Sequence, residues 1–144
     1  MRLVAMLSLS LLALIAGCRA HGGKESAMID GTWIPETAEL AGQPFPSEAL
    51  QTMQLVIRAD TYVVTVAGRD DKGTVALLPG VAPAAMEIRG VEGPNQGKSF
   101  PAIYELKGDN LRVCYDLAGG AGPTAFTTAV GTQQFLVNYR RVKS

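Results

Sequence analysis

The segment Ile103–Asp116, IYELKGDNLRVCYD, decides the fold. Apolar and polar side chains alternate along it on both sides of Gly108 and Asp109, and this alternation is typical of half-buried antiparallel strands. Glycine and aspartate between two such runs favour a tight turn. The segment therefore predicts a β-hairpin.

The same period of two continues in both directions along the chain. The clearest alternating runs are Met53–Ile57, Tyr62–Val66, Phe100–Leu106, Leu111–Tyr115 and Phe135–Tyr139. Less regular strands are expected at Trp33–Leu40, Gly73–Leu78 and Ala85–Val91. Turn sequences such as GRDDKG and EGPNQGK separate the runs.

These runs predict an all-β fold. Strands in simple succession can close into an antiparallel up-and-down barrel, which leaves no exposed sheet edge. We expect a small barrel of about eight strands with one short helix at Pro46–Met53, for which Ser47 would be the N-cap. A β-sandwich is the competing architecture.

The N-terminal segment has the features of a bacterial export signal. Arg2 is followed by an apolar run from Leu3 to Ile15, too short for an ordinary membrane span. The sequence Ile15-Ala16-Gly17-Cys18 resembles the lipobox of bacterial lipoproteins, which implies cleavage before Cys18 and lipid attachment to it. We expect 1–17 to be a lipoprotein signal peptide.

The residues after Cys18 predict a tether and then one domain. Residues 18–28 are polar and aperiodic, which is typical of a flexible linker, and 29–144 form the barrel domain. Arg19 follows the lipidated cysteine in place of the aspartate that signals inner-membrane retention. We therefore expect an exported protein, lipid-anchored in the cell envelope and most simply at the outer membrane. With Cys18 lipidated, Cys114 would have no disulfide partner.

Composition excludes some partners. The chain has 13 Lys and Arg against 13 Asp and Glu, and removing the signal peptide takes away one Arg, which leaves 12 against 13. Without a basic surplus, nucleic acid is not an expected partner. The expected partners are the membrane, through the N-terminal lipid, and a small hydrophobic ligand or an envelope protein.

Two resemblances support the barrel. The sequence Gly31-Thr32-Trp33, with an arginine near the end of the last strand, is similar to the lipocalin pattern. In that fold the tryptophan closes one end of the barrel and the arginine packs over its ring. If Tyr139 faces inward, parity places Arg141 inward as well and Arg140 outward. We therefore expect a Trp33–Arg141 pair.

A wider resemblance covers nearly the whole domain. The segments DGTW, AELAGQPFP, GKSFPAIYELKGDNLRVCYD, GPTAF and YRR resemble an uncharacterised lipocalin-like domain family that is abundant in planctomycetes and often exported. The chain departs from this pattern at Gly122, where the family usually has arginine. The resemblance implies the fold and no particular chemistry.

Four tyrosines share the face expected to point inward. They are Tyr62, Tyr104, Tyr115 and Tyr139. They would either line a cavity for a small apolar ligand or simply fill the core.

Catalysis is not expected. The single histidine, His21, lies in the tether, so neither Cys114 nor a serine has a histidine base in the domain. Asp70 and Asp71 are interpreted as a solvated acidic turn without the spacing of a calcium loop. No cofactor and no metal site are expected.

The sequence therefore leaves two main functions open. The first is a non-catalytic lipoprotein that binds a small apolar ligand or an envelope component. The alternative is a structural or protein-interaction module with a solid core and no ligand cavity.

Overall fold

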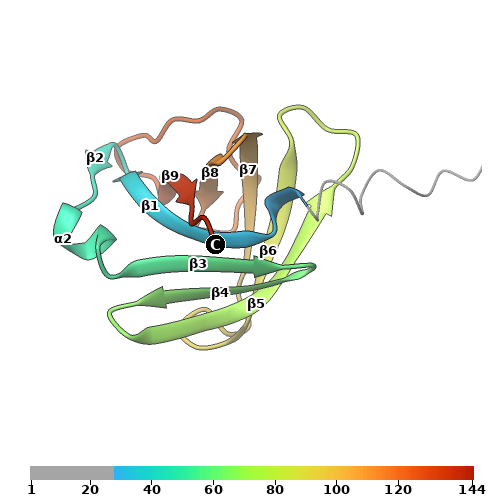
Figure 1. The fold of residues 1–144 in the computed structure, drawn as a ribbon. Helices are drawn as coiled ribbons and strands as arrows, with labels where there is room; N and C mark the ends of the chain where they lie inside the picture. The colour runs from blue at the N-terminus through green and yellow to red at the C-terminus, as the bar shows by residue number, and fades with distance from the viewer. Residues whose placement is uncertain (1–27) are drawn as a thin grey trace, which may run out of the picture.

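The computed structural model describes residues 28–144, which form an eight-stranded closed antiparallel barrel with one additional short strand (Figure 1). The barrel strands are β1 (Gly31–Leu40), β3 (Met53–Arg58), β4 (Thr61–Val66), β5 (Arg69–Leu78), β6 (Ala85–Glu92), β7 (Ser99–Lys107), β8 (Asn110–Asp116) and β9 (Gln134–Arg141). The expected all-β barrel is confirmed, and the sandwich is not found. The expected signal peptide and the tether up to Ala27 lie outside the described residues.

The barrel closes because β1 pairs with two strands at once. Its beginning pairs with β3, Trp33 opposite Leu55, and the part from Trp33 to Leu40 pairs with β9, from Trp33 opposite Arg141 to Leu40 opposite Phe135. All other strands pair with their neighbours in sequence, so every connection is local. The first and last strands are thereby joined across more than a hundred residues of chain (Figure 1).

Short connections between β1 and β3 differ from the sequence expectations. A two-residue strand, β2 (Gln43–Pro44), pairs antiparallel with the end of β1. The alternation of side chains did not predict this strand. The helix α2 spans only Ser47–Leu50, and its N-cap is Pro46 without a side-chain hydrogen bond. Ser47 as N-cap was therefore wrong. Pro46 supplies no side-chain acceptor, so the fixed φ of the proline sets the start of the helix.

The predicted turn before Gly73 was also wrong. Strand β5 already begins at Arg69, and only Ala67 and Gly68 form the turn after β4. Both residues have positive φ, which suits a two-residue hairpin turn. The charged run 69–72 is thus part of a strand, and Asp71 faces the barrel interior instead of solvent.

One end of the barrel is closed by Trp33 and Arg141. Trp33 is fully buried, and its indole Nε1 donates a hydrogen bond of 2.9 Å to the carbonyl oxygen of Ile29. The guanidinium carbon of Arg141 lies 4.2 Å from the centre of the indole ring, and Arg141 also donates to the carbonyls of Met28 and Asp30. Such a cation–π contact contributes roughly 0.5–2 kcal/mol.

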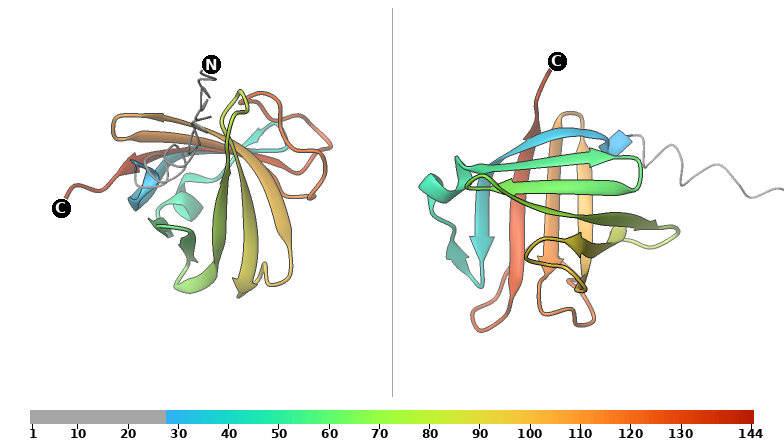
Figure 2. Two further views of the ribbon diagram at one scale, coloured as in Figure 1. Left: turned by 90° about the vertical axis from the view of Figure 1, so that its right-hand side faces the viewer. Right: turned by 90° about the horizontal axis from the view of Figure 1, so that it is seen from below.

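The opposite end holds the long segment 117–133 between β8 and β9 (Figure 2). This segment folds against the outer face of the sheet, where Phe126 lies under the guanidinium of Arg112 at 4.0 Å. Cys114 points outward from the barrel, as parity predicts, yet is fully buried, and its thiol contacts the carbonyl of Thr127 at 3.6 Å. The outer face is therefore partly a second apolar layer.

Among residues 28–144, no helix is long and apolar enough to cross a membrane.

Replacing Trp33 with Ala should lower the free energy of unfolding by about 3–5 kcal/mol, because it leaves a cavity at the closed end and removes the ring against which the Arg141 guanidinium packs. Denaturant unfolding followed by circular dichroism measures this change. The adjacent Ile34→Ala variant is the control, because Ile34 is 39% exposed and its loss should cost less than about 1 kcal/mol. Equal effects of the two substitutions would contradict the closing role of Trp33.

Candidate functional site

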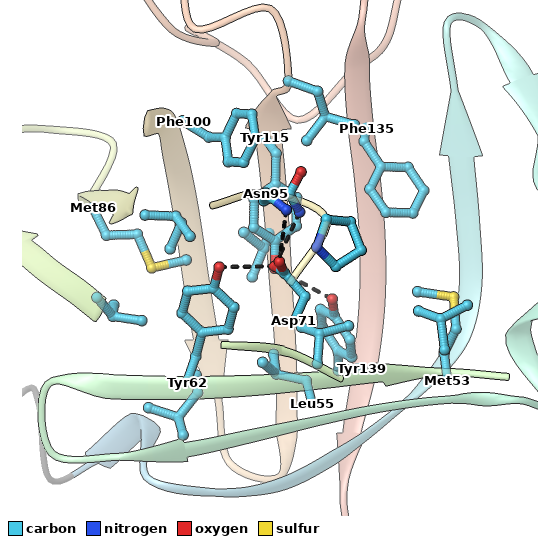
Figure 3. Close-up of a pocket in the computed structure, with 18 of the residues that line it drawn as sticks. Met53, Leu55, Tyr62, Asp71, Met86, Asn95, Phe100, Tyr115, Phe135 and Tyr139 are labelled. Carbon is cyan, nitrogen blue, oxygen red and sulfur yellow. Dashed lines mark hydrogen bonds between the residues drawn. The ribbon is translucent and has the colours of Figure 1, made fainter. Parts of the chain in front are cut away.

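The barrel encloses a cavity of about 490 Å³ (Figure 3). Most of its wall is apolar and comes from the seven strands β3 to β9. The apolar lining residues are Met53, Leu55, Ile57, Val64, Val66, Val75, Met86, Ile88, Phe100, Val113, Leu117 and Phe135. This volume lies within the range of small-molecule sites, about 300–1,000 Å³.

The cavity opens at the end opposite Trp33. The lining residues Val66, Arg69 and Pro94 are solvent-exposed, whereas Val113 and Tyr139 at the other side of the cavity are buried. We call this opening, between the β4–β5 turn and the loop 93–98, the mouth. Strand polarity places Met28 and the C terminus at the closed end, away from the mouth.

A carboxylate stands inside this apolar wall. Asp71 is 8% exposed and is the one buried charged residue in the part of the chain that the structure describes. Tyr62 Oη donates to Asp71 Oδ2 at 2.9 Å, and Asn95 donates to both oxygens, from its backbone nitrogen at 2.9 Å and its side-chain amide at 3.0 Å. Figure 3 shows these three side chains pointing toward one another in the cavity. Three hydrogen bonds offset much of the cost of burying the charge.

Two glycines give Tyr62 and the loop 93–98 the space to reach Asp71. A Cβ at Gly73 would lie 1.9 Å from the carbonyl oxygen of Arg89 and 2.7 Å from the Tyr62 ring. At Gly93, where φ is +100°, a Cβ would lie 2.6 Å from the carbonyl oxygen of Asp70. The cluster therefore depends on backbone positions that accept no side chain.

A second polar pair lines the cavity on β8 and β9. The hydroxyls of Tyr115 and Tyr139 are 3.2 Å apart, and either can be the donor. Burial raises the pKa of Tyr139 to about 12, against a smaller opposing effect of the hydrogen bond with Tyr115. Burial and then the nearby Tyr139 raise the pKa of Tyr115, and burial followed by the hydrogen bond to Asp71 raises that of Tyr62. All three phenols stay protonated at neutral pH.

The structure brings three of the four singled-out tyrosines together in the cavity wall. Tyr62, Tyr115 and Tyr139 line the cavity, whereas Tyr104 is buried near the closed end beside Ile29 and does not line it. The expectation of a ligand-lining Tyr104 therefore does not fit this geometry. Inward parity was right, but Tyr104 lies too far from the mouth along its strand.

The other singled-out residues lie outside the cavity. Trp33 and Arg141 face each other at the closed end. Arg140 points outward, where it pairs with Glu36 at 2.7 Å. Burial raises the pKa of the Cys114 thiol, which is remote from the cavity. Cys18, the expected lipidation site, lies outside the described residues.

Asp71 is the site residue that sequence reasoning missed. The run of charged residues before Gly73 was interpreted as a turn. The two-residue spacing that places Asp71 on the same inward face as Gly73 and Val75 was therefore not considered. Extending the strand by four residues toward Arg69 would have placed Asp71 on the same face as Val75. An inward-facing carboxylate between apolar positions was the available signal.

The cavity carries few polar groups. Apart from Arg69 at the mouth and Asp71, its polar groups are hydroxyls and the Asn95 amide. Within residues 28–144 no three His, Cys, Asp or Glu side chains gather to hold a metal ion. The arrangement offers an apolar wall with a few fixed polar groups, which orients a ligand.

Comparison of the chain with protein-family models, curated proteins and solved structures found no match.

Raising the pH from 10 to 12 should destabilise the fold. In this window tyrosines of the unfolded chain ionise, while the raised pKa values of Tyr62, Tyr115 and Tyr139 delay ionisation in the folded chain, that of Tyr139 until about pH 12. The stability that these three groups give below pH 10 is therefore lost as the pH rises. Each such tyrosine contributes up to about 1.4 kcal/mol per pH unit. Thermal melts across this range measure how steeply stability falls with pH. Tyr139→Phe should make this fall less steep, by the contribution of one tyrosine. An unchanged slope in that variant would contradict the burial of Tyr139.

Proposed function

We propose that this protein is a lipid-anchored, non-catalytic binding module that holds a small apolar ligand in its barrel. The observation that carries the proposal is the open cavity of about 490 Å³ with its largely apolar wall. Each 100 Å² of ligand apolar surface removed from water there would contribute about 2.5 kcal/mol to binding. The cell-envelope location follows from the lipobox-like sequence at Cys18.

The cavity weighs against the alternative of a structural module with a solid core. A barrel with only a structural role has no need of space between Leu55, Val113 and Phe135, because filling it would add dispersion contacts and stability.

The polar groups also weigh against an enzyme. Asp71 is held by three donors, and no nucleophile stands beside it among the described residues.

The placement of the mouth suits a tethered binding protein. The described chain starts at Met28, whose carbonyl oxygen accepts a hydrogen bond of 2.8 Å from Arg141 at the closed end. The mouth lies at the other end of the barrel from this first described residue. Ligand exchange would then be open while the protein stays anchored.

Binding can be tested with N-phenylnaphthylamine, a neutral apolar dye that fluoresces when it leaves water. The chain should bind it, and Val64→Trp should weaken binding at least about tenfold by filling the cavity. Val63→Trp is the matched control, because Val63 is the next residue on β4 and points to the other face.

Equal dye binding by the two folded tryptophan variants would show that the dye does not occupy the barrel. The proposed function would be refuted if the unmodified chain bound neither this dye nor an aliphatic competitor.

The anchor is tested by Cys18→Ser, which removes the thiol that would carry the lipid. The variant should move from the membrane fraction to the soluble fraction of the cell envelope, since two or three acyl chains hold a lipoprotein almost permanently. Cys114→Ser is the control and should stay with the membrane. A Cys18→Ser protein that remains in the membrane fraction would refute the lipid anchor.

A further inference from the structure

The buried carboxylate of Asp71 has no cationic partner within the described chain. Its three hydrogen-bond donors are a phenol, a backbone amide and a side-chain amide, all neutral. Lys72, the nearest lysine in sequence, pairs instead with Asp70 and Glu92 on the outer surface. Buried carboxylates are usually paired with a positive charge, so this one is available to a cation that enters the cavity.

Asp71 also keeps room for one more donor. A carboxylate offers about four acceptor positions, and Oδ1 receives only the backbone amide of Asn95. Close by, the Tyr62 hydroxyl already donates its hydrogen bond to Asp71, so it can only accept a hydrogen bond from a ligand. The polar groups at this wall of the cavity therefore call for a ligand with several hydrogen-bond donors.

Arg69 is the other charged group that faces the cavity, two residues nearer the mouth on the same strand. It forms no ion pair with Asp71, and it is solvent-exposed. Water and salt screen an exposed charge, whereas the same charge in partly buried surroundings interacts about four times more strongly. The buried Asp71 therefore dominates the charge preference of the cavity, and Arg69 influences entry at its rim.

We propose that the cavity selects apolar molecules that carry a protonated amine, and that Asp71 is the residue that selects them. The amine would donate to Asp71 Oδ1 and to the Tyr62 hydroxyl, while the hydrocarbon part lies against Leu55, Met86 and Phe100. This inference rests on the proposed function, because it needs a ligand in the barrel. It excludes fatty acids as preferred ligands, since a second carboxylate beside Asp71 would be repelled.

The test compares three probes of equal chain length, octylamine, octanol and octanoate, as competitors of N-phenylnaphthylamine at neutral pH. The full chain is used in the detergent-free form that Cys18→Ser provides. Octylamine should bind at least about tenfold more tightly than octanoate, the factor that one charge-assisted hydrogen bond supplies. Asp71→Asn should bring this ratio within about threefold, with both probes measured against the dye affinity of that same variant.

Asp70→Asn is the matched control. It removes the same charge from the neighbouring residue, which lies on the outer face and is 46% exposed. The preference for octylamine should survive in this variant. If Asp71→Asn does not fold, Tyr62→Phe replaces it, because it keeps the charge and frees an acceptor position. Octylamine affinity should then rise relative to octanol.

The possible failures are distinguishable. If neither the dye nor any octyl probe binds, the proposed function is wrong and this inference fails with it. If the dye binds but octylamine gains nothing over octanoate, the amine selection is wrong and the binding function stands. An equal loss of preference in Asp70→Asn and Asp71→Asn would also overturn the inference, since net charge alone would explain it.

Discussion

The pairing of β1 with β9 is the constraint on which the rest of the structure depends. Without it the other strands would form an open sheet with two free edges and no enclosed space. The pair is held at one end by Trp33 and Arg141, which are opposite each other in the register and in contact through the indole face. This single junction makes the sheet a barrel (Figure 1) and gives the cavity its closed end.

The cavity exists because the two ends of the barrel are occupied differently, by large side chains at the closed end and by a loop at the mouth. At the closed end, the large side chains of Trp33, Ile29 and Leu111 are almost fully buried in the interior. Toward the mouth, the loop 93–98 folds against the barrel interior, where Asn95 donates two hydrogen bonds to Asp71. Because Asp71 needs that loop to satisfy its oxygens, the carboxylate also defines part of the cavity wall. One residue thus links loop position, local polarity and the proposed choice of ligand.

The alternation of side chains predicted five of the eight barrel strands, and the other three were expected from less regular runs. It also predicted that Arg141 faces inward and Arg140 outward, because parity extends along a strand that does not bulge. It was less successful where charges interrupt the pattern. The start of β5 was assigned to a turn because Asp and Gly are common in turns, and pairing with β4 overrode that preference.

The sequence by itself determined the fold class, the strand order and the inward or outward face of the side chains in its clearly alternating runs, since these follow from a period of two and short connections. It also contained the lipobox-like segment at Cys18. Only the tertiary structure decided that the interior is hollow, that Tyr104 lies away from the cavity, and that Asp71 is inside it. These properties depend on how strands tilt and how the loop 93–98 folds back, because volume and burial arise from contacts between residues distant in sequence.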